Sequence, residues 1–153
     1  YLTQTTLSVD ETREIVGILK ERFPAIESPR KEDICYATTN RQAAVKILAE
    51  RCEGLLVIGA PNSSNSMRLV EVAERSGCAE VAMVQRASDI PWERIKNIGT
   101  IGITAGASAP ETLVEEVVDA FSRRYDVSVE EIVTNQEQVV FKMPKILERE
   151  GAA

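Results

Sequence analysis

Three short apolar runs, each followed by a helical pattern, constrain the fold of this chain more than any other feature of its sequence. The runs span residues 54–60, 79–85 and 100–104, and the first of them is typical of a strand buried on both faces. Between them, apolar residues recur at helical spacing, as Leu69, Val70 and Ala73 do. Strands that alternate with helices indicate a parallel sheet, because each crossover helix packs back onto the sheet.

We therefore expect an α/β fold with a parallel four-stranded sheet flanked by helices. Three pairs have the spacing of capping boxes: Ser8 with Glu11, Thr39 with Gln42, and Ser108 with Glu111. The further elements we expect are strands at 2–7 and 137–143, and helices at 10–23, from 39 onward, at 66–76, ended by Gly77, at 88–97 and at 110–124.

Composition excludes several classes of function. The chain has 153 residues, of which 44% are hydrophobic and 27% charged, as expected for a globular protein with one core of ordinary size. A net charge of −6 argues against a general nucleic-acid binder, and no apolar run is long enough to cross a membrane. No signal peptide is visible, so we expect a cytoplasmic protein. Because the chain starts at Tyr1, we expect it to be a piece of a longer protein.

Clusters of Thr, Ser and Asn stand at four predicted junctions between a strand and a helix. The carboxyl ends of parallel strands lie at one edge of a sheet, so clusters from distant parts of the sequence should meet there. Helix N-termini present unpaired N–H groups and a partial positive charge, which together with hydroxyl donors suit a phosphate. The four clusters cover residues 5–8, 38–40, 63–66 and 104–108.

Capping is the alternative interpretation of each cluster, since Ser, Thr and Asn are the preferred N-cap residues. One cap needs one side chain, however, and the stretch APNSSNSMRL supplies Ser63, Ser64, Asn65 and Ser66. Surplus uncharged donors at one helix start favour a ligand site. Within that stretch we expect Ser66 to be the cap and the other three to meet the ligand.

The chain contains no histidine, and its three cysteines lack the Cys-x-x-Cys spacing of metal and redox motifs. Cys52 shares a helical face with Val45 and Leu48, and Cys78 begins a strand, so we expect both to be structural. Cys35 lies three residues before a hydroxyl cluster, where it could be a buried thiol, a nucleophile or a metal ligand. A nucleophile would need a nearby base, and histidine, the usual one, is missing.

Four longer stretches carry a more specific signal: TQTTLSVDET, DICYATTNRQAAV, NSSNSMRL and GITAGASAPETLVEEV. In this order they resemble the 4-hydroxy-3-methylbut-2-enyl diphosphate reductase family, the iron–sulfur enzymes of the last step of the non-mevalonate isoprenoid pathway. The resemblance runs from Tyr1 to about Leu147. It implies the C-terminal half of a protein with three α/β domains around a central cavity. Residues 1–30 would end the middle domain, 31–124 would form the third domain, and 125–153 a C-terminal extension.

The resemblance also implies a role for individual residues. Cys35 would be one of three cysteines that hold a 4Fe–4S cluster, and Thr5 a catalytic threonine that reaches the site across a domain interface. The diphosphate of the substrate would be bound by Ser63, Ser64, Asn65 and Ser108. The implied reaction is reductive dehydroxylation of the allylic alcohol diphosphate to isopentenyl and dimethylallyl diphosphate, with electrons from a ferredoxin- or flavodoxin-type donor.

The other cluster cysteines, the histidines and the glutamate of that family belong to its N-terminal half. We therefore expect this chain alone to be inactive and unable to hold a stable cluster. Two other interpretations stay open. One is a phosphate-binding α/β module of the sugar-phosphate isomerase type without redox chemistry, and the other is a structural domain whose caps are only caps. Cys35 distinguishes the reductase from the phosphate-binding module. Ser63 and Ser64 distinguish the phosphate-binding module from the structural domain.

Overall fold

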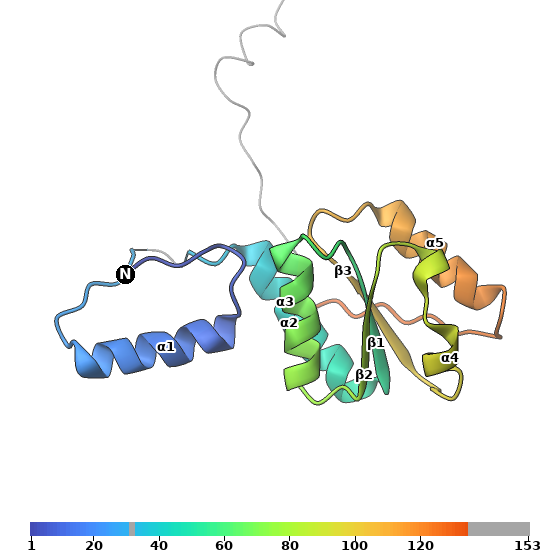
Figure 1. Cartoon of the computed structure of the whole chain (residues 1–153), viewed down its shortest axis with the longest axis horizontal. Coiled ribbons are helices and arrows are strands. Elements are labelled where there is room, and N and C mark those ends of the chain that lie inside the picture. The colour runs from blue at the N-terminus through green and yellow to red at the C-terminus, as the bar shows by residue number, and fades with distance from the viewer. Residues whose placement is uncertain (31–32, 135–153) are drawn as a thin grey trace, which may run out of the picture.

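A computed structural model of the chain describes residues 1–30 and 33–134 (Figure 1). It confirms an α/β fold in which helices flank a parallel sheet. The elements in chain order are α1 (Val9–Arg22), α2 (Tyr36–Arg51), β1 (Gly54–Ile58), α3 (Ser64–Arg75), β2 (Glu80–Val84), the short 3-10 helix η1 (Ala87–Asp89), α4 (Trp92–Ile95), β3 (Ile101–Ala105) and α5 (Glu111–Ser122).

The sheet has three strands in the described residues, in the order β2-β1-β3, rather than the four that the sequence led us to expect. All pairs are parallel, and Ile58 at the end of β1 is in register with Val84 and Ala105. The carboxyl ends of the three strands therefore lie at one edge. The strand expected at 137–143 lies outside the described residues.

Successive residues of β1 point into two separate cores, as the two-residue period of a strand requires. Leu55 and Val57 pack with residues of α2 and α3, whereas Leu56 and Ile58 pack with residues of α4 and α5. The pairs of helices cover opposite faces of the sheet (Figure 1). Burial on both faces explains why the run of residues 54–58 is apolar throughout.

The segment 2–7 is not the strand that we predicted, because the chain turns at Thr5 and Thr6. Hydrogen bonds with the side chains of Asp33 and Gln42 hold this segment instead of a strand ladder. The helix that follows begins as predicted: Ser8 is the N-cap of α1, and its hydroxyl accepts from the Glu11 amide at 3.3 Å.

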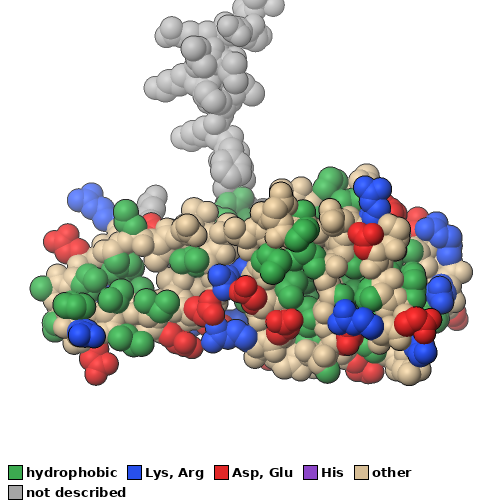
Figure 2. Space-filling view, viewed as in Figure 1, with side chains coloured by type: hydrophobic (Ala, Val, Ile, Leu, Met, Phe, Trp, Pro, Cys, Tyr) green, Lys and Arg blue, Asp and Glu red, His purple; other side chains and the backbone are tan. Residues whose placement is uncertain are grey.

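Helix α1 lies beside the rest of the described structure and buries none of its residues (Figure 1). Large apolar side chains on the helix and at its C-cap are open to solvent, with exposed fractions of 59% for Ile15, 63% for Ile18 and 53% for the C-cap residue Phe23. Figure 2 shows hydrophobic side chains gathered over this helix. Ion pairs link it to α3, where Arg68 and Arg75 both contact Glu11.

Several predicted helix boundaries need correction. Helix α2 begins at Tyr36 with Cys35 as its N-cap, so Thr39 and Gln42 form no capping box. The helix expected at 88–97 is two short pieces, η1 and α4, separated by Ile90 and Pro91. Gly77, with a φ of +89°, follows the end of α3 as predicted. Among the described residues, no helix has the length and apolar character needed to cross a membrane.

Candidate functional site

A cavity of about 460 Å³ opens at the edge where the three strands end. Residues that follow each strand contribute to it, among them Ser63 after β1, Arg86 after β2 and Ser108 after β3. The amide of Gly106 donates to the carbonyl of Ile58 at 2.8 Å, which ties the ends of β3 and β1 together. The prediction that Ser63 and Ser108 meet at this edge is thus confirmed.

The first turn of α3 packs closely against the ends of β1 and β3. Ser66 is 1% exposed, and a Cβ atom added at Gly59 or Gly106 would lie 2.2 or 2.4 Å from its Oγ. Only glycine leaves room for this hydroxyl at both positions. The expectation that Ser66 caps the helix is therefore wrong: Ser63 is the N-cap and accepts from the Ser66 amide at 3.3 Å.

The hydroxyl of Ser63 is left with its own proton to donate. Its oxygen accepts from the amide of Ser66 and from the hydroxyl of Ser66, at 3.3 and 3.1 Å. These two bonds occupy both lone pairs of a serine hydroxyl, so the remaining O–H is a donor at the cavity wall. Capping and ligand binding are compatible in this one side chain.

Asn65 is buried, with 8% of its surface exposed, yet its Nδ2 has no hydrogen-bond partner in the described part of the chain. Its Oδ1 accepts from the hydroxyl of Thr38 at 3.4 Å, which fixes the amide with its donor end turned away from Thr38. A buried amide without a partner destabilises a protein by about 1–3 kcal/mol. Such a donor next to Ser66 and Gly106 suits a ligand oxygen.

Cys35 is held by Thr38. Its Sγ accepts from the Thr38 amide at 3.4 Å and lies 3.0 Å from the Thr38 hydroxyl. The hydrogen bond with the Thr38 side chain lowers the pKa of Cys35, and backbone N–H groups of the first turn of α2 act in the same direction against partial burial. Thr38 therefore lies between the thiol and Asn65. Its single hydroxyl proton can be donated to Asn65 Oδ1 while the Cys35 thiol donates to Thr38 Oγ1, or to Sγ once the thiol is ionised. Of this arrangement only the three-residue spacing is visible in the sequence.

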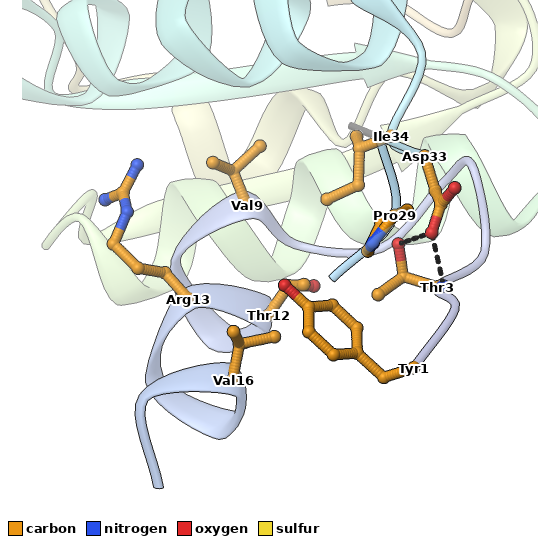
Figure 3. A pocket seen from close by; sticks show the side chains of 9 residues that line it. All are labelled: Tyr1, Thr3, Val9, Thr12, Arg13, Val16, Pro29, Asp33 and Ile34. Atoms are coloured by element: carbon orange, nitrogen blue, oxygen red, sulfur yellow. Dashed lines mark hydrogen bonds between the residues drawn. The ribbon is translucent and has the colours of Figure 1, made fainter. Parts of the chain in front are cut away.

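Thr5 is joined to Cys35 by a backbone hydrogen bond. The carbonyl of Thr5 accepts from the Cys35 amide at 3.2 Å, while the rest of the residue is exposed. Upstream, the carboxylate of Asp33 accepts from the Thr3 amide at 2.7 Å and from its hydroxyl at 3.3 Å (Figure 3). A second cavity, of about 220 Å³, adjoins this contact and is lined by residues of α1, by Tyr1 and Thr3, and by Pro29, Asp33 and Ile34 (Figure 3).

Gln42 anchors the same segment further along. Its Oε1 accepts from the Val9 amide at 2.9 Å and its Nε2 donates to the Leu7 carbonyl at 2.8 Å. Gln42 is 2% exposed, so these two bonds are made in a buried place where alternatives are scarce. The segment 3–9, which forms no strand, is thus held in position by Asp33, Cys35 and Gln42.

The structure does not bring every predicted residue into one cavity. Ser63 and Ser108 line the cavity of about 460 Å³, whereas Thr5, Cys35, Ser64 and Asn65 are not among its lining residues. In the part of the chain that the structure describes, no three metal-binding side chains stand together. Cys52 and Cys78 fit the structural role predicted for them: Cys78 is buried, and burial raises the pKa of Cys52.

A family model described as LytB protein matches residues 1–122. The chain belongs to the LytB protein family. A LytB relative from Cereibacter sphaeroides, the 4-hydroxy-3-methylbut-2-enyl diphosphate reductase, is 60% identical over 152 residues, which are 99% of this chain and 47% of the relative. A relative of the same name from Bradyrhizobium diazoefficiens, numbered 1, is 57% identical over 100% of this chain and 48% of its own length.

Solved LytB structures agree with this assignment. The E-1-hydroxy-2-methyl-but-2-enyl-4-diphosphate reductase from Plasmodium falciparum superposes with a TM-score of 0.89 at 32% identity, over 98% of this chain and 49% of that one. The chain thus spans about half the length of the curated relatives it matches. Cys35, a partly buried thiol with a lowered pKa, fits a single thiolate ligand of the iron–sulfur cluster that the family implies.

Proposed function

We propose that this chain is the C-terminal part of a LytB reductase that converts 4-hydroxy-3-methylbut-2-enyl diphosphate into isopentenyl and dimethylallyl diphosphate. One observation carries the proposal: Thr38 contacts both the thiol of Cys35 and the amide of Asn65, whose buried Nδ2 has no partner among the described residues. A metal-binding sulfur and a phosphate-binding donor thus share one hydrogen-bonded residue. The names of the LytB relatives support the same reaction.

The diphosphate would be bound by donors that carry no charge. Ser63 offers the proton that its cap does not use, Asn65 offers Nδ2, and Ser64 and Ser108 offer exposed hydroxyls. The N-terminus of α3 adds backbone N–H groups and a partial positive charge. Thr5 would act as the catalytic threonine, brought to the site by the bond between its carbonyl and the Cys35 amide.

Cys35 would hold one iron of a 4Fe–4S cluster, which supplies the electrons of the reduction when it is bound. The hydrogen bonds from Thr38 favour the thiolate form that a metal ligand needs. The remaining ligands would come from outside this chain, as would the ferredoxin- or flavodoxin-type electron donor. Three free cysteines are consistent with a reducing, cytoplasmic location.

Residues 1–30 would complete a middle domain, with residues 31–124 as the third domain and 125–153 as a C-terminal extension. The exposed apolar side chains of α1 support this division, because a second domain packed on that helix would bury them. Thr5 would then reach the site from the neighbouring domain. The missing half of the protein is accordingly its main partner.

A chimaera tests the proposal. The N-terminal half of the Cereibacter sphaeroides relative is joined in frame to Tyr1, and the purified protein is compared with the chain alone. We expect the chimaera to carry a brown 4Fe–4S chromophore and to reduce the allylic diphosphate, and the chain alone to do neither. Cys35→Ala in the chimaera should abolish the chromophore, with Cys52→Ala as the control. A chromophore that survives Cys35→Ala unchanged would contradict the ligand assignment.

Ser63 and Ser64 separate a ligand site from a mere cap. Ser63→Ala removes the cap and should lower the free energy of unfolding by about 1 kcal/mol. Ser64 is exposed and makes no cap, so Ser64→Ala should leave stability within about 0.5 kcal/mol. If both variants also weaken binding of inorganic diphosphate, the cluster binds a ligand. If Ser64→Ala binds as tightly as the wild type, its assignment to the diphosphate is wrong.

A further inference from the structure

Among the described residues that line the cavity at the strand ends, Arg86 alone carries a charge. It follows β2, which pairs with β1 on the side opposite β3. Arg86 therefore reaches the cavity from one flank, Ser108 from the other, and Ser63 lies between them at the start of α3. Sequence analysis did not select Arg86, because none of the four hydroxyl clusters follows this strand.

The backbone around Arg86 is fixed by Asp89. The carboxylate of Asp89 accepts from the amides of Gln85 and Arg86 at 3.0 and 3.2 Å and from the hydroxyl of Ser88 at 3.1 Å. These bonds lower the pKa of Asp89, the Gln85 amide most of all, while the charge of the Arg86 side chain contributes least. The turn after β2 is thereby held in one conformation at the cavity rim.

The guanidinium of Arg86 forms no ion pair within the described structure, although its charge acts weakly on Asp89. No carboxylate of the described residues lies within 4 Å of it, and this also holds for Lys20, Arg22 and Arg123 at helix ends, but Arg86 alone of these lines the cavity. Several other basic side chains do have a carboxylate within that distance, including Arg51, Arg68, Arg75, Arg94 and Lys96. A positive charge that forms no ion pair, at the rim of a cavity lined by hydroxyl donors, favours an anionic ligand.

We propose that Arg86 is a further substrate-binding residue, which attracts and orients the diphosphate at the entrance of the cavity. The inference rests on the proposed function of the site. The donors assigned above are neutral, whereas a diphosphate carries several negative charges near neutral pH. Arginine matches phosphate oxygens with a planar fork of N–H groups, so Arg86 supplies the charge that this donor set lacks.

Titration calorimetry of inorganic diphosphate into the full chain tests the role of Arg86. Arg86→Gln removes the charge and keeps a polar side chain of moderate length. Arg123→Gln is the matched control, because Arg123 is exposed at the far end of α5, about 15 Å along the helix from the lining residue Leu113. Each protein is measured at low and at high salt.

We expect Arg86→Gln to weaken diphosphate binding about three- to tenfold at low salt, and Arg123→Gln to leave it unchanged. Added salt should narrow the gap between wild type and Arg86→Gln, since screening weakens the attraction of exposed charges. Inorganic monophosphate, with fewer charges, should lose less affinity than diphosphate in the same variant. This ordering distinguishes a charge effect from a change in cavity shape.

Two results would overturn the inference, and they are distinguishable. If wild type and Arg86→Gln bind diphosphate equally well, or if Arg123→Gln loses as much affinity as Arg86→Gln, Arg86 has no specific role. The hydroxyl site would not be affected by either result. Ser64→Ala is the positive control for binding to that site. Absence of diphosphate binding to the wild-type chain and to the chimaera would overturn the proposed function and the role of Arg86 together.

Discussion

Ser66 packs against Gly59 and Gly106, and the geometry predicts that alanine has a different effect at these two positions. Neither Gly59 nor Gly106 has the positive φ that excludes alanine, because among the described residues only Gly77 does. The obstacle to alanine is therefore steric. At position 106 an added Cβ would lie 2.4 Å from the Oγ of Ser66 but 3.6 Å from its Cβ. At position 59 it would lie 2.2 Å from Oγ and 2.5 Å from Cβ.

Removing the hydroxyl of Ser66 should thus rescue one substitution and not the other. We expect overpacking in Gly106→Ala to lower the free energy of unfolding by about 1–3 kcal/mol. Alanine also restricts the unfolded chain, which offsets about 0.4–1 kcal/mol of this loss. Ser66→Ala alone loses the hydrogen bond to Ser63 and should lower the free energy of unfolding by about 0.5–1.5 kcal/mol. In the double variant with Gly106→Ala the remaining Cβ contact is ordinary, so we expect a favourable coupling of about 1–2 kcal/mol.

Gly59→Ala is the internal control, because its Cβ contact with Ser66 persists after the hydroxyl is removed. We expect its cost and that of Ser66→Ala to add within about 0.5 kcal/mol. Urea unfolding followed by the fluorescence of Trp92, the single tryptophan of the chain, measures all five variants. Equal rescue of both glycine substitutions by Ser66→Ala would refute the steric argument, as would a cost of Gly106→Ala near zero.

Three further predictions concern Cys35, Gln42 and the attachment of α1. Thr38→Val removes the hydroxyl that lowers the pKa of Cys35, so alkylation of this thiol should slow at pH below about 8.5 and recover at higher pH, as peptide mass spectrometry would reveal; an unchanged pH profile would contradict this. Gln42→Ala leaves the Leu7 carbonyl and the Val9 amide without their hydrogen-bond partner and should speed hydrogen exchange of the Val9 amide. Gln4→Ala, at an exposed position, should not change this exchange rate. Of the ion pairs between α1 and α3, that of Arg75 is exposed and that of Arg68 is half-buried, so high salt should loosen α1 with a loss of about 1 kcal/mol or less, measured by hydrogen exchange in that helix.

The sequence was sufficient for the parallel sheet and its ligand edge because those features follow from local patterns. The apolar run of β1 and the hydroxyls of Ser63 and Ser108 are visible without knowledge of any distant partner. The start of α2 was predicted three residues late, because cysteine is an unusual N-cap and Thr39 offered a more ordinary one.

What the sequence could not reveal depends on residues far apart in the chain. Gln42 resembled part of a capping box, but its partners Leu7 and Val9 lie 35 and 33 residues away. Ser66 resembled a cap, but the close approach of Gly59 and Gly106 makes it a buried packing residue. Arg86 carried no motif, and its position at the cavity follows only from the strand order.

The contact of Ser66 with the two glycines also constrains how this site can diverge among related proteins. A residue larger than glycine at position 106 is compatible only with a side chain at position 66 that ends at Cβ, whereas position 59 admits no such exchange. Loss of the Ser66 hydroxyl would in turn leave Ser63 with one hydrogen bond fewer. Positions 66 and 106 should therefore covary in natural sequences, and position 59 should remain invariant wherever α3 starts this close to the sheet.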